Sequence, residues 1–135
     1  MTDEHPPRVR LDHMIVPARH RQESADFFAH MFGLPGPEPI GFFLQIKLDD
    51  GRILDFADAP ADLPGLHLAF LVDDDTFDAV VERLRTEGID HWADPQQRRP
   101  NEINTNHGGR GVYFTDPSGH YLEALTARYD GSSLT

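Results

Sequence analysis

Four ionisable side chains stand in the middle of short apolar segments of this 135-residue chain: His13, Asp55, His67 and Glu123. An unpaired carboxylate buried on a sheet is costly, so each of these groups needs a partner. Imidazole and carboxylate are donors that bind divalent cations. Singly, such a residue is more often a hydrogen-bonded surface group than a ligand. A cation shared by two histidines and one or two carboxylates would satisfy all four, so the pattern predicts a divalent-metal site.

Side chains alternate between the two faces of a strand, which separates these ionisable groups from the apolar residues. His67 shares its face with Ala69 and Leu71, whereas Leu68 and Phe70 point the opposite way. On the same reasoning His13 lies with Leu11 and Ile15, Asp55 with Ile53 and Ala57, and Glu123 with Tyr121 and Leu125, while Tyr113 faces away from Val112 and Phe114. One face is thus predicted to pack under helices and the other to carry the chemistry.

The elements that must position these residues follow from apolar spacing and turn residues along the chain. In the first half we expect a strand at 11–16 ended by Pro17, a helix at 24–32 capped by Gly33, and a hairpin of strands 42–48 and 52–57; a short strand around Ile40 is a further candidate. In the second half we expect a strand at 66–72, a helix from the acidic run 73–75 to Gly88, and strands at 90–92, 111–115 and 121–126.

The two halves repeat the same order of elements, with His13 aligned to His67 and Gly33 to Gly88. Self-similarity of this kind marks a repeat architecture. The chain is therefore predicted to be a single α+β domain, 1–135, built from two βαβββ modules at about 10–60 and 65–128. The segment 94–109 interrupts the symmetry, and a loop of this length is functional or mobile unless it is a disordered insertion. His120 lies next to a turn and is expected to be exposed.

Composition excludes several classes of protein. The formal charge of −11 argues against nucleic acid or an anionic membrane as the main partner. The absence of cysteine removes disulfides, thiol nucleophiles and thiolate metal sites. Since neither a signal peptide nor an apolar stretch of spanning length is visible, we expect a soluble, cytoplasmic protein that acts on a small molecule.

Two segments carry a resemblance to a known family: residues 65–70 (GLHLAF) and 111–123 (GVYFTDPSGHYLE). With the βαβββ repeat, they resemble the vicinal oxygen chelate superfamily of glyoxalases, fosfomycin- and bleomycin-resistance proteins and extradiol dioxygenases. The resemblance covers about residues 10–128. It implies a curled mixed sheet that forms a metal-binding cup, with the helices outside. Its two-His-one-Glu ligand set falls on His13, His67 and Glu123, and Asp55 falls where glyoxalase I enzymes carry a fourth, glutamate ligand.

The ending of the chain is similar to that of extradiol dioxygenases, in which His107, Tyr113 and Glu123 would match the motif, although the spacer after His107 is short. That similarity implies that Tyr113 and His107 hydrogen-bond the substrate and the oxygen-derived species on Fe²⁺, and that the substrate is catechol-like. The alternatives are that Tyr113 only lines the cup and that His107 is an ordinary loop residue. Asp55, shorter than the family's glutamate, is a candidate ligand, base or second-shell acceptor.

Other chemistries of the family stay open. A glyoxalase-like lyase or isomerase, or a thiol transferase, would use Ni²⁺, Co²⁺, Zn²⁺ or Mn²⁺ and a positive rim, for which Arg98, Arg99 and Arg110 are the candidates. A bleomycin-resistance-type binding protein would suit the acidic charge but needs no metal ligands. The family also implies a homodimer, in which the two modules of one cup come from one chain or from two.

Overall fold

The computed structural model describes residues 5–60 and 62–134, and the elements follow the predicted order. Module one consists of β1 (His13–Ala18), α1 (Arg21–Phe32), β2 (Glu38–Ile40), β3 (Phe43–Lys47) and β4 (Ile53–Asp58). Module two consists of β5 (His67–Leu71), α2 (Asp74–Thr86), β6 (His91–Trp92), β7 (Gly111–Thr115) and β8 (Tyr121–Leu125), with a short 3₁₀ turn at Asn106–Gly108. Strand β1 continues past Val16 through Pro17, which an edge strand tolerates.

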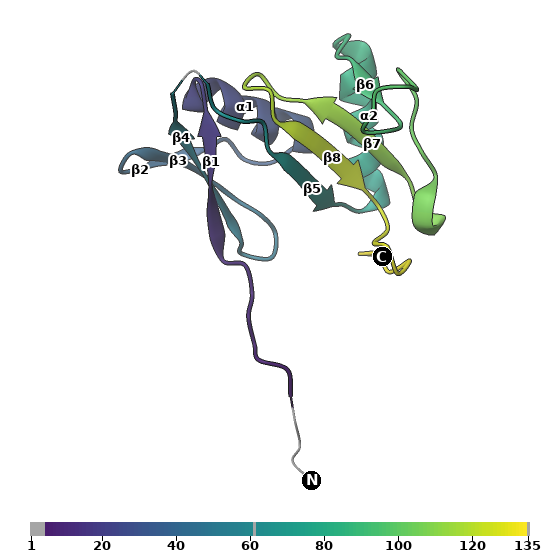
Figure 1. Ribbon diagram of the computed structural model, residues 1–135, viewed down its shortest axis with the longest axis horizontal. Coiled ribbons are helices and arrows are strands. Elements are labelled where there is room, and N and C mark those ends of the chain that lie inside the picture. The colour runs from purple at the N-terminus through teal and green to yellow at the C-terminus, as the bar shows by residue number, and fades with distance from the viewer. Residues whose placement is uncertain (1–4, 61, 135) are drawn as a thin grey trace.

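The described residues form two four-stranded mixed sheets (Figure 1), which confirms the α+β fold class. Sheet A has the strand order β1-β4-β3-β2 and sheet B has the order β5-β8-β7-β6. In each sheet the first strand of the module pairs parallel with the last, and the other pairs are antiparallel. Hydrogen bonding runs within each sheet, so β1 and β5 both lie at sheet edges. The two modules therefore repeat one topology without merging into one hydrogen-bonded sheet.

The end of α1 and the start of α2 agree with the sequence prediction, whereas α1 begins at Arg21, three residues before the predicted start, and α2 ends at Thr86. Gly33 adopts a left-handed conformation (φ +70°) after α1, and its N–H reaches the carbonyls of the last turn. The Asp73 side chain caps α2 by accepting from the Thr76 N–H at 2.9 Å.

The core lies between the helices and the inner faces of the sheets, as the alternation predicts. The strand residues of the buried hydrophobic core are Val16, Leu44, Ile46, Leu54, Phe56, Val112, Phe114, Leu122 and Ala124. Helix α1 joins the modules, because Phe28 packs against Phe56 of sheet A (6.1 Å between ring centroids) and against Phe70 of sheet B (4.9 Å). Rings in such contacts bury large apolar areas. The core is thus shared, although the sheets are not.

His120 is fully buried (0% exposed), so the prediction that it is exposed is wrong. Its Nδ1 accepts a hydrogen bond from the Leu66 N–H at 2.9 Å, and its Nε2 donates to the Pro17 carbonyl. A carbonyl can only accept, so the proton is on Nε2 and the ring is neutral. Ser118 adds a second link between the modules through Ser24 (2.6 Å). Module one covers the turn of module two, which sequence spacing alone does not reveal.

The segment between β6 and β7 is held by its own hydrogen bonds. Asp94 accepts from the Arg98 and Arg99 N–H groups at 2.8–3.0 Å. Asn104 donates to the Ala93 carbonyl at 2.8 Å and packs against Gly111, where a Cβ would meet it at 2.9 Å. These contacts argue against a disordered insertion. Among the residues described, no helix has the length and apolar character needed to cross a membrane.

Candidate metal centre

Two of the predicted ligands meet on the open face of sheet B. The Nε2 atom of His67 lies 2.9 Å from Oε1 of Glu123. The residues sit diagonally on the paired strands β5 and β8, where Glu123 is opposite Ala69. The side chain of Glu123 is 13% exposed and that of His67 is 52% exposed. One imidazole and one mostly buried carboxylate, converging on one point, are a donor pair that fits a divalent ion.

Tyr113 stands beside this pair on β7, directly opposite Glu123 in the register. Burial, followed by the negative charge of Glu123, raises the pKa of Tyr113 to about 12. The phenol is therefore neutral at physiological pH and can donate a hydrogen bond to a bound oxygen. The His67 and Tyr113 rings lie 6.0 Å apart. Three of the predicted site residues thus share one face of one sheet.

Two further aromatic side chains complete the cluster, and the sequence did not assign them a role. Tyr121 lies 5.8 Å from Tyr113 and 6.5 Å from Trp92 between ring centroids, in edge-on contacts. Tyr121 is two residues before Glu123 on the same strand and therefore lies on the same face. This spacing was the only feature of the sequence that could have predicted its position here. The Tyr121 hydroxyl is buried, and within residues 5–60 and 62–134 no group hydrogen-bonds it. A buried polar group without a partner costs about 1–3 kcal/mol.

Two of the other three predicted residues, His13 and Asp55, lie on sheet A. His13 is paired with Ile53 and Asp55 with Ile15, so the two side chains share the open face of β1 and β4. Nδ1 of His13 contacts Asp12 Oδ2 at 2.9 Å, and this contact does not involve Nε2. Asp55 accepts a long hydrogen bond of 3.5 Å from Gln45. The contact of His13 with Asp12 was also missed, because the two residues are sequence neighbours without any spacing signal.

The structure does not bring all the predicted ligands together in one chain. Across the described residues, no three His, Asp or Glu side chains are clustered closely enough to hold a metal ion. His107 lies on the 3₁₀ turn with φ +57° and packs against Tyr129, with 5.0 Å between ring centroids. Tyr129 follows the end of β8, whereas Glu123 is in the middle of that strand. Sheet B therefore holds a His–Glu–Tyr group, and His13, Asp55 and His107 lie elsewhere.

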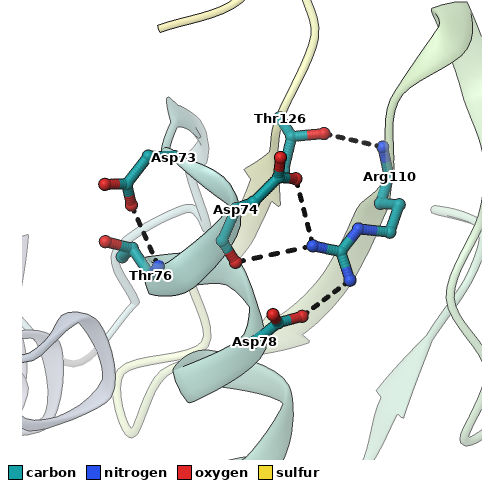
Figure 2. Close-up of polar contacts among 6 residues, drawn as sticks. All are labelled: Asp73, Asp74, Thr76, Asp78, Arg110 and Thr126. Carbon is teal, nitrogen blue, oxygen red and sulfur yellow. Dashed lines mark hydrogen bonds and ion pairs between the residues drawn. The ribbon is translucent and has the colours of Figure 1, made fainter. Parts of the chain in front are cut away.

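Arg110 is engaged in structural contacts at the start of β7 (Figure 2). Its guanidinium binds Asp78 at 2.7 Å and Asp74 at 3.1 Å on α2, and it lies 4.6 Å above the Phe77 ring. Its backbone N–H donates to the Thr126 hydroxyl at 2.8 Å. The hydrogen bond to Asp78 contributes most to a raised pKa of Arg110. This cation holds the 94–110 segment on α2, so it is not available as a rim for an anionic substrate.

The repeat, the edge strands and the His–Glu pair can now be compared with known proteins. A family model described as the Glyoxalase/Bleomycin resistance protein/Dioxygenase superfamily matches residues 10–124. The chain belongs to this superfamily. The resemblance seen in residues 65–70 and 111–123 is thereby confirmed.

Solved structures of this superfamily are similar over most of the chain. Oxidase ChaP-H1 is 50% identical with a TM-score of 0.88, and the match covers 91% of this chain and 99% of that one. Oxidase ChaP-H2 is 45% identical with a TM-score of 0.87, covering 92% and 98%. A glyoxalase/dioxygenase from Nostoc punctiforme is 25% identical with a TM-score of 0.64, covering 86% and 89%. All three names are those of enzymes, and the first two are named oxidases.

Proposed function

We propose that the chain is a divalent-metal-dependent oxidase, with Fe²⁺ favoured, that acts on a small aromatic substrate bearing two adjacent oxygens. The observation that carries this proposal is the His67–Glu123 pair beside the neutral phenol of Tyr113. The similarity to two structures named oxidases supports oxygen chemistry over lyase chemistry. The extradiol-type reaction on a catechol-like substrate is the specific form that we propose.

We further propose that His13 of a second copy supplies the third ligand. His13 lies on β1 and His67 on β5, and both strands are at the edge of their sheets. Such edges carry backbone groups that another chain can pair with. Leu11 and Ile15 flank His13 on the open face and are 61% and 53% exposed, which is typical of a surface that another protein covers. A homodimer would cover these apolar residues and bring His13 to the His67–Glu123 pair.

The residues of this chain have distinct proposed roles around the metal. When bound, Fe²⁺ would supply open positions for both substrate oxygens and for dioxygen. His67 and Glu123 would hold the ion, and the Tyr113 hydroxyl would donate a hydrogen bond to a substrate oxygen. Asp55, which shares a face with His13, is proposed to accept a proton or to hold a ligand in place. His107 is the weaker catalytic candidate, because it packs against Tyr129 beyond the end of β8.

Metal analysis of variants tests both the site and its division between copies. We expect His67→Ala and His13→Ala each to lose the metal that the wild type carries. When the two variants are unfolded together and refolded as a mixture, half of the dimers contain one copy of each, and each of these has one intact site. The mixture should therefore recover about a quarter of the wild-type metal content. Equal metal in His67→Ala and wild type would contradict the site, and no recovery on mixing would contradict the shared site.

Nitric oxide tests the reaction class. Added to the anaerobic Fe²⁺ protein, it should give a high-spin paramagnetic signal, and catechol should perturb that signal. If the protein shows no such signal and no change with catechol, the result would favour the second candidate. That candidate is a glyoxalase-like lyase or isomerase, in which Asp55 is the fourth ligand. That candidate is weakened by Arg110, which is bound to Asp74 and Asp78 instead of lining a rim for an anionic thiol. Binding of a cationic glycopeptide to metal-free protein, measured by calorimetry, would instead favour the bleomycin-resistance-type binder.

A further inference from the structure

The Tyr121 hydroxyl is a buried polar group for which the described part of the chain provides no hydrogen-bond partner. Tyr121 lies two residues before Glu123 on β8, so both side chains project from the same face. Its ring contacts Tyr113, Trp92 and His67 at 5.8–6.5 Å between centroids. The unsatisfied hydroxyl therefore belongs to the aromatic group that surrounds the His67–Glu123 pair.

A phenylalanine would make the same ring contacts without burying an unsatisfied hydroxyl. Tyr121 has the one buried side-chain oxygen or nitrogen without a partner among residues 5–60 and 62–134; His120, for comparison, bonds Leu66 and Pro17, and Asn104 bonds Ala93. Native proteins rarely leave such a group unpaired, and each exception calls for an explanation, such as a role in binding or catalysis. The position of the Tyr121 hydroxyl beside the His67–Glu123 pair makes it a candidate contact for a ligand of that site.

We propose that the Tyr121 hydroxyl binds a third polar atom of the substrate, apart from the two oxygens that face the metal. This inference rests on the proposed function of the same site. A substrate held beside Glu123, with its ring against Tyr113 and Trp92, places its far edge next to Tyr121. A phenol both donates and accepts, so the partner is a hydroxyl or a carbonyl. A carboxylate is disfavoured because Glu123 carries a negative charge nearby.

Trp92 can report on a ligand that reaches Tyr121, because the two rings are in contact. The Trp92 and Tyr113 rings meet Tyr121 by their edges, and Trp92 is partly exposed at the short strand β6. Trp92 is the single tryptophan of the chain. Binding of a substrate with a third oxygen should therefore change tryptophan fluorescence through one identifiable residue.

The experiment compares ligands with two and with three oxygens. Zn²⁺-loaded protein, which binds but does not turn over, is titrated anaerobically with catechol, pyrogallol, 1,2,4-trihydroxybenzene and 3,4-dihydroxybenzaldehyde while Trp92 fluorescence is recorded. We expect at least one of the last three to bind about tenfold more tightly than catechol, the effect of one hydrogen bond. Tyr121→Phe should reduce the affinity for that ligand to the affinity for catechol and should leave the affinity for catechol unchanged. It should also raise the Tm of the ligand-free protein. Tyr129→Phe, at an exposed tyrosine, is the matched control and should change none of these values.

The outcomes separate this inference from the proposed function. If catechol and all its derivatives fail to bind the wild type, the proposed function itself is contradicted. If catechol binds but no three-oxygen ligand binds more tightly, or if Tyr121→Phe weakens all ligands equally, only the role of Tyr121 is overturned. Sedimentation gives a further check: if Tyr121→Phe weakens the dimer, the hydroxyl bonds a second copy and not the substrate.

Discussion

Sheet A and sheet B have the same topology, yet only sheet B assembles part of a site. On sheet B, His67, Glu123 and Tyr113 contact one another within one face. On sheet A, His13 bonds its neighbour Asp12 and Asp55 makes one long contact with Gln45. A repeat in sequence has therefore become two unequal halves: sheet B holds a donor pair, whereas on sheet A His13 lies on the edge strand β1 and Asp55 on the neighbouring strand β4.

The difference follows from what each module places between its second and third strands. In module one, residues 41–42 join β2 to β3, and in module two residues 93–110 join β6 to β7. Within the longer connection, Pro100 pairs with Trp92 of β6 and Asn104 pairs with Gly111 of β7, and Arg110 fixes the connection on α2. It thereby supports the aromatic cluster of sheet B. The two-residue connection of module one provides no comparable support for its sheet.

The largest effect should come from breaking the link between the two sheets. Phe28→Ala removes a ring that contacts both Phe56 and Phe70, and we expect a loss of about 3–5 kcal/mol in the free energy of unfolding. Urea unfolding followed by circular dichroism measures it. Phe42→Ala, at a ring that is 89% exposed, is the control and should change stability by less than about 0.5 kcal/mol. A small loss for Phe28→Ala would mean that the modules are stable independently.

The carboxylates of the two sheets should differ in their effect on metal affinity. We expect Glu123→Ala to weaken metal binding at least about 100-fold, because Glu123 is a proposed ligand next to His67. Asp55→Ala should weaken metal binding by only about tenfold, as does removal of a group that orients a metal ligand without binding the metal. Competition with a chromophoric chelator measures both constants. Equal losses would show instead that Asp55 is a fourth ligand, which would favour glyoxalase-like chemistry.

Arg110 of module two should contribute more to the free energy of unfolding than Arg52 of module one. Arg110→Met removes a partly buried guanidinium that binds Asp74 and Asp78, and we expect it to cost about 1 kcal/mol in unfolding free energy. Arg52→Met, whose partner Asp50 lies in the same exposed hairpin, should cost less than about 0.5 kcal/mol. Urea midpoints at low and high salt separate the two variants. Loss of Tyr113-dependent ligand binding in Arg110→Met would further indicate that the 94–110 segment positions β7.

The smallest effect is the pH dependence of Tyr113. Its pKa is raised from 10.0 to about 12 in the folded chain, so the neutral phenol is favoured by folding. The resulting stabilisation is fully present below pH 10 and is lost as the pH rises from about 10 to about 12. In metal-free protein, tyrosinate absorbance should show a component near pH 12 that Tyr113→Phe removes. Because burial is the main cause, Glu123→Gln should shift this component down without returning it to pH 10.

Much of the fold could be read from residue patterns. Alternation along the strands predicted the buried rows, such as Leu54 and Phe56 opposite Asp55, because a strand has a period of two. Helix boundaries were also predictable, since Gly33 and Asp73 act through local backbone geometry. The burial of His120 and the engagement of Arg110 were not predictable, because their partners lie 103 and 32 residues away.

The sequence by itself determined which donors this protein offers and on which strand faces they lie. Those properties depend on residue type and on the short-range periods of helix and strand, which hold before any tertiary contact forms. Only the tertiary structure decided which donors meet. It brought His67 and Glu123 to 2.9 Å, packed Tyr121 beside them, and left His13 at the edge of the other sheet. These outcomes depend on how the two modules pack around α1, because contacts between distant segments are set by the shared core and not by local pattern.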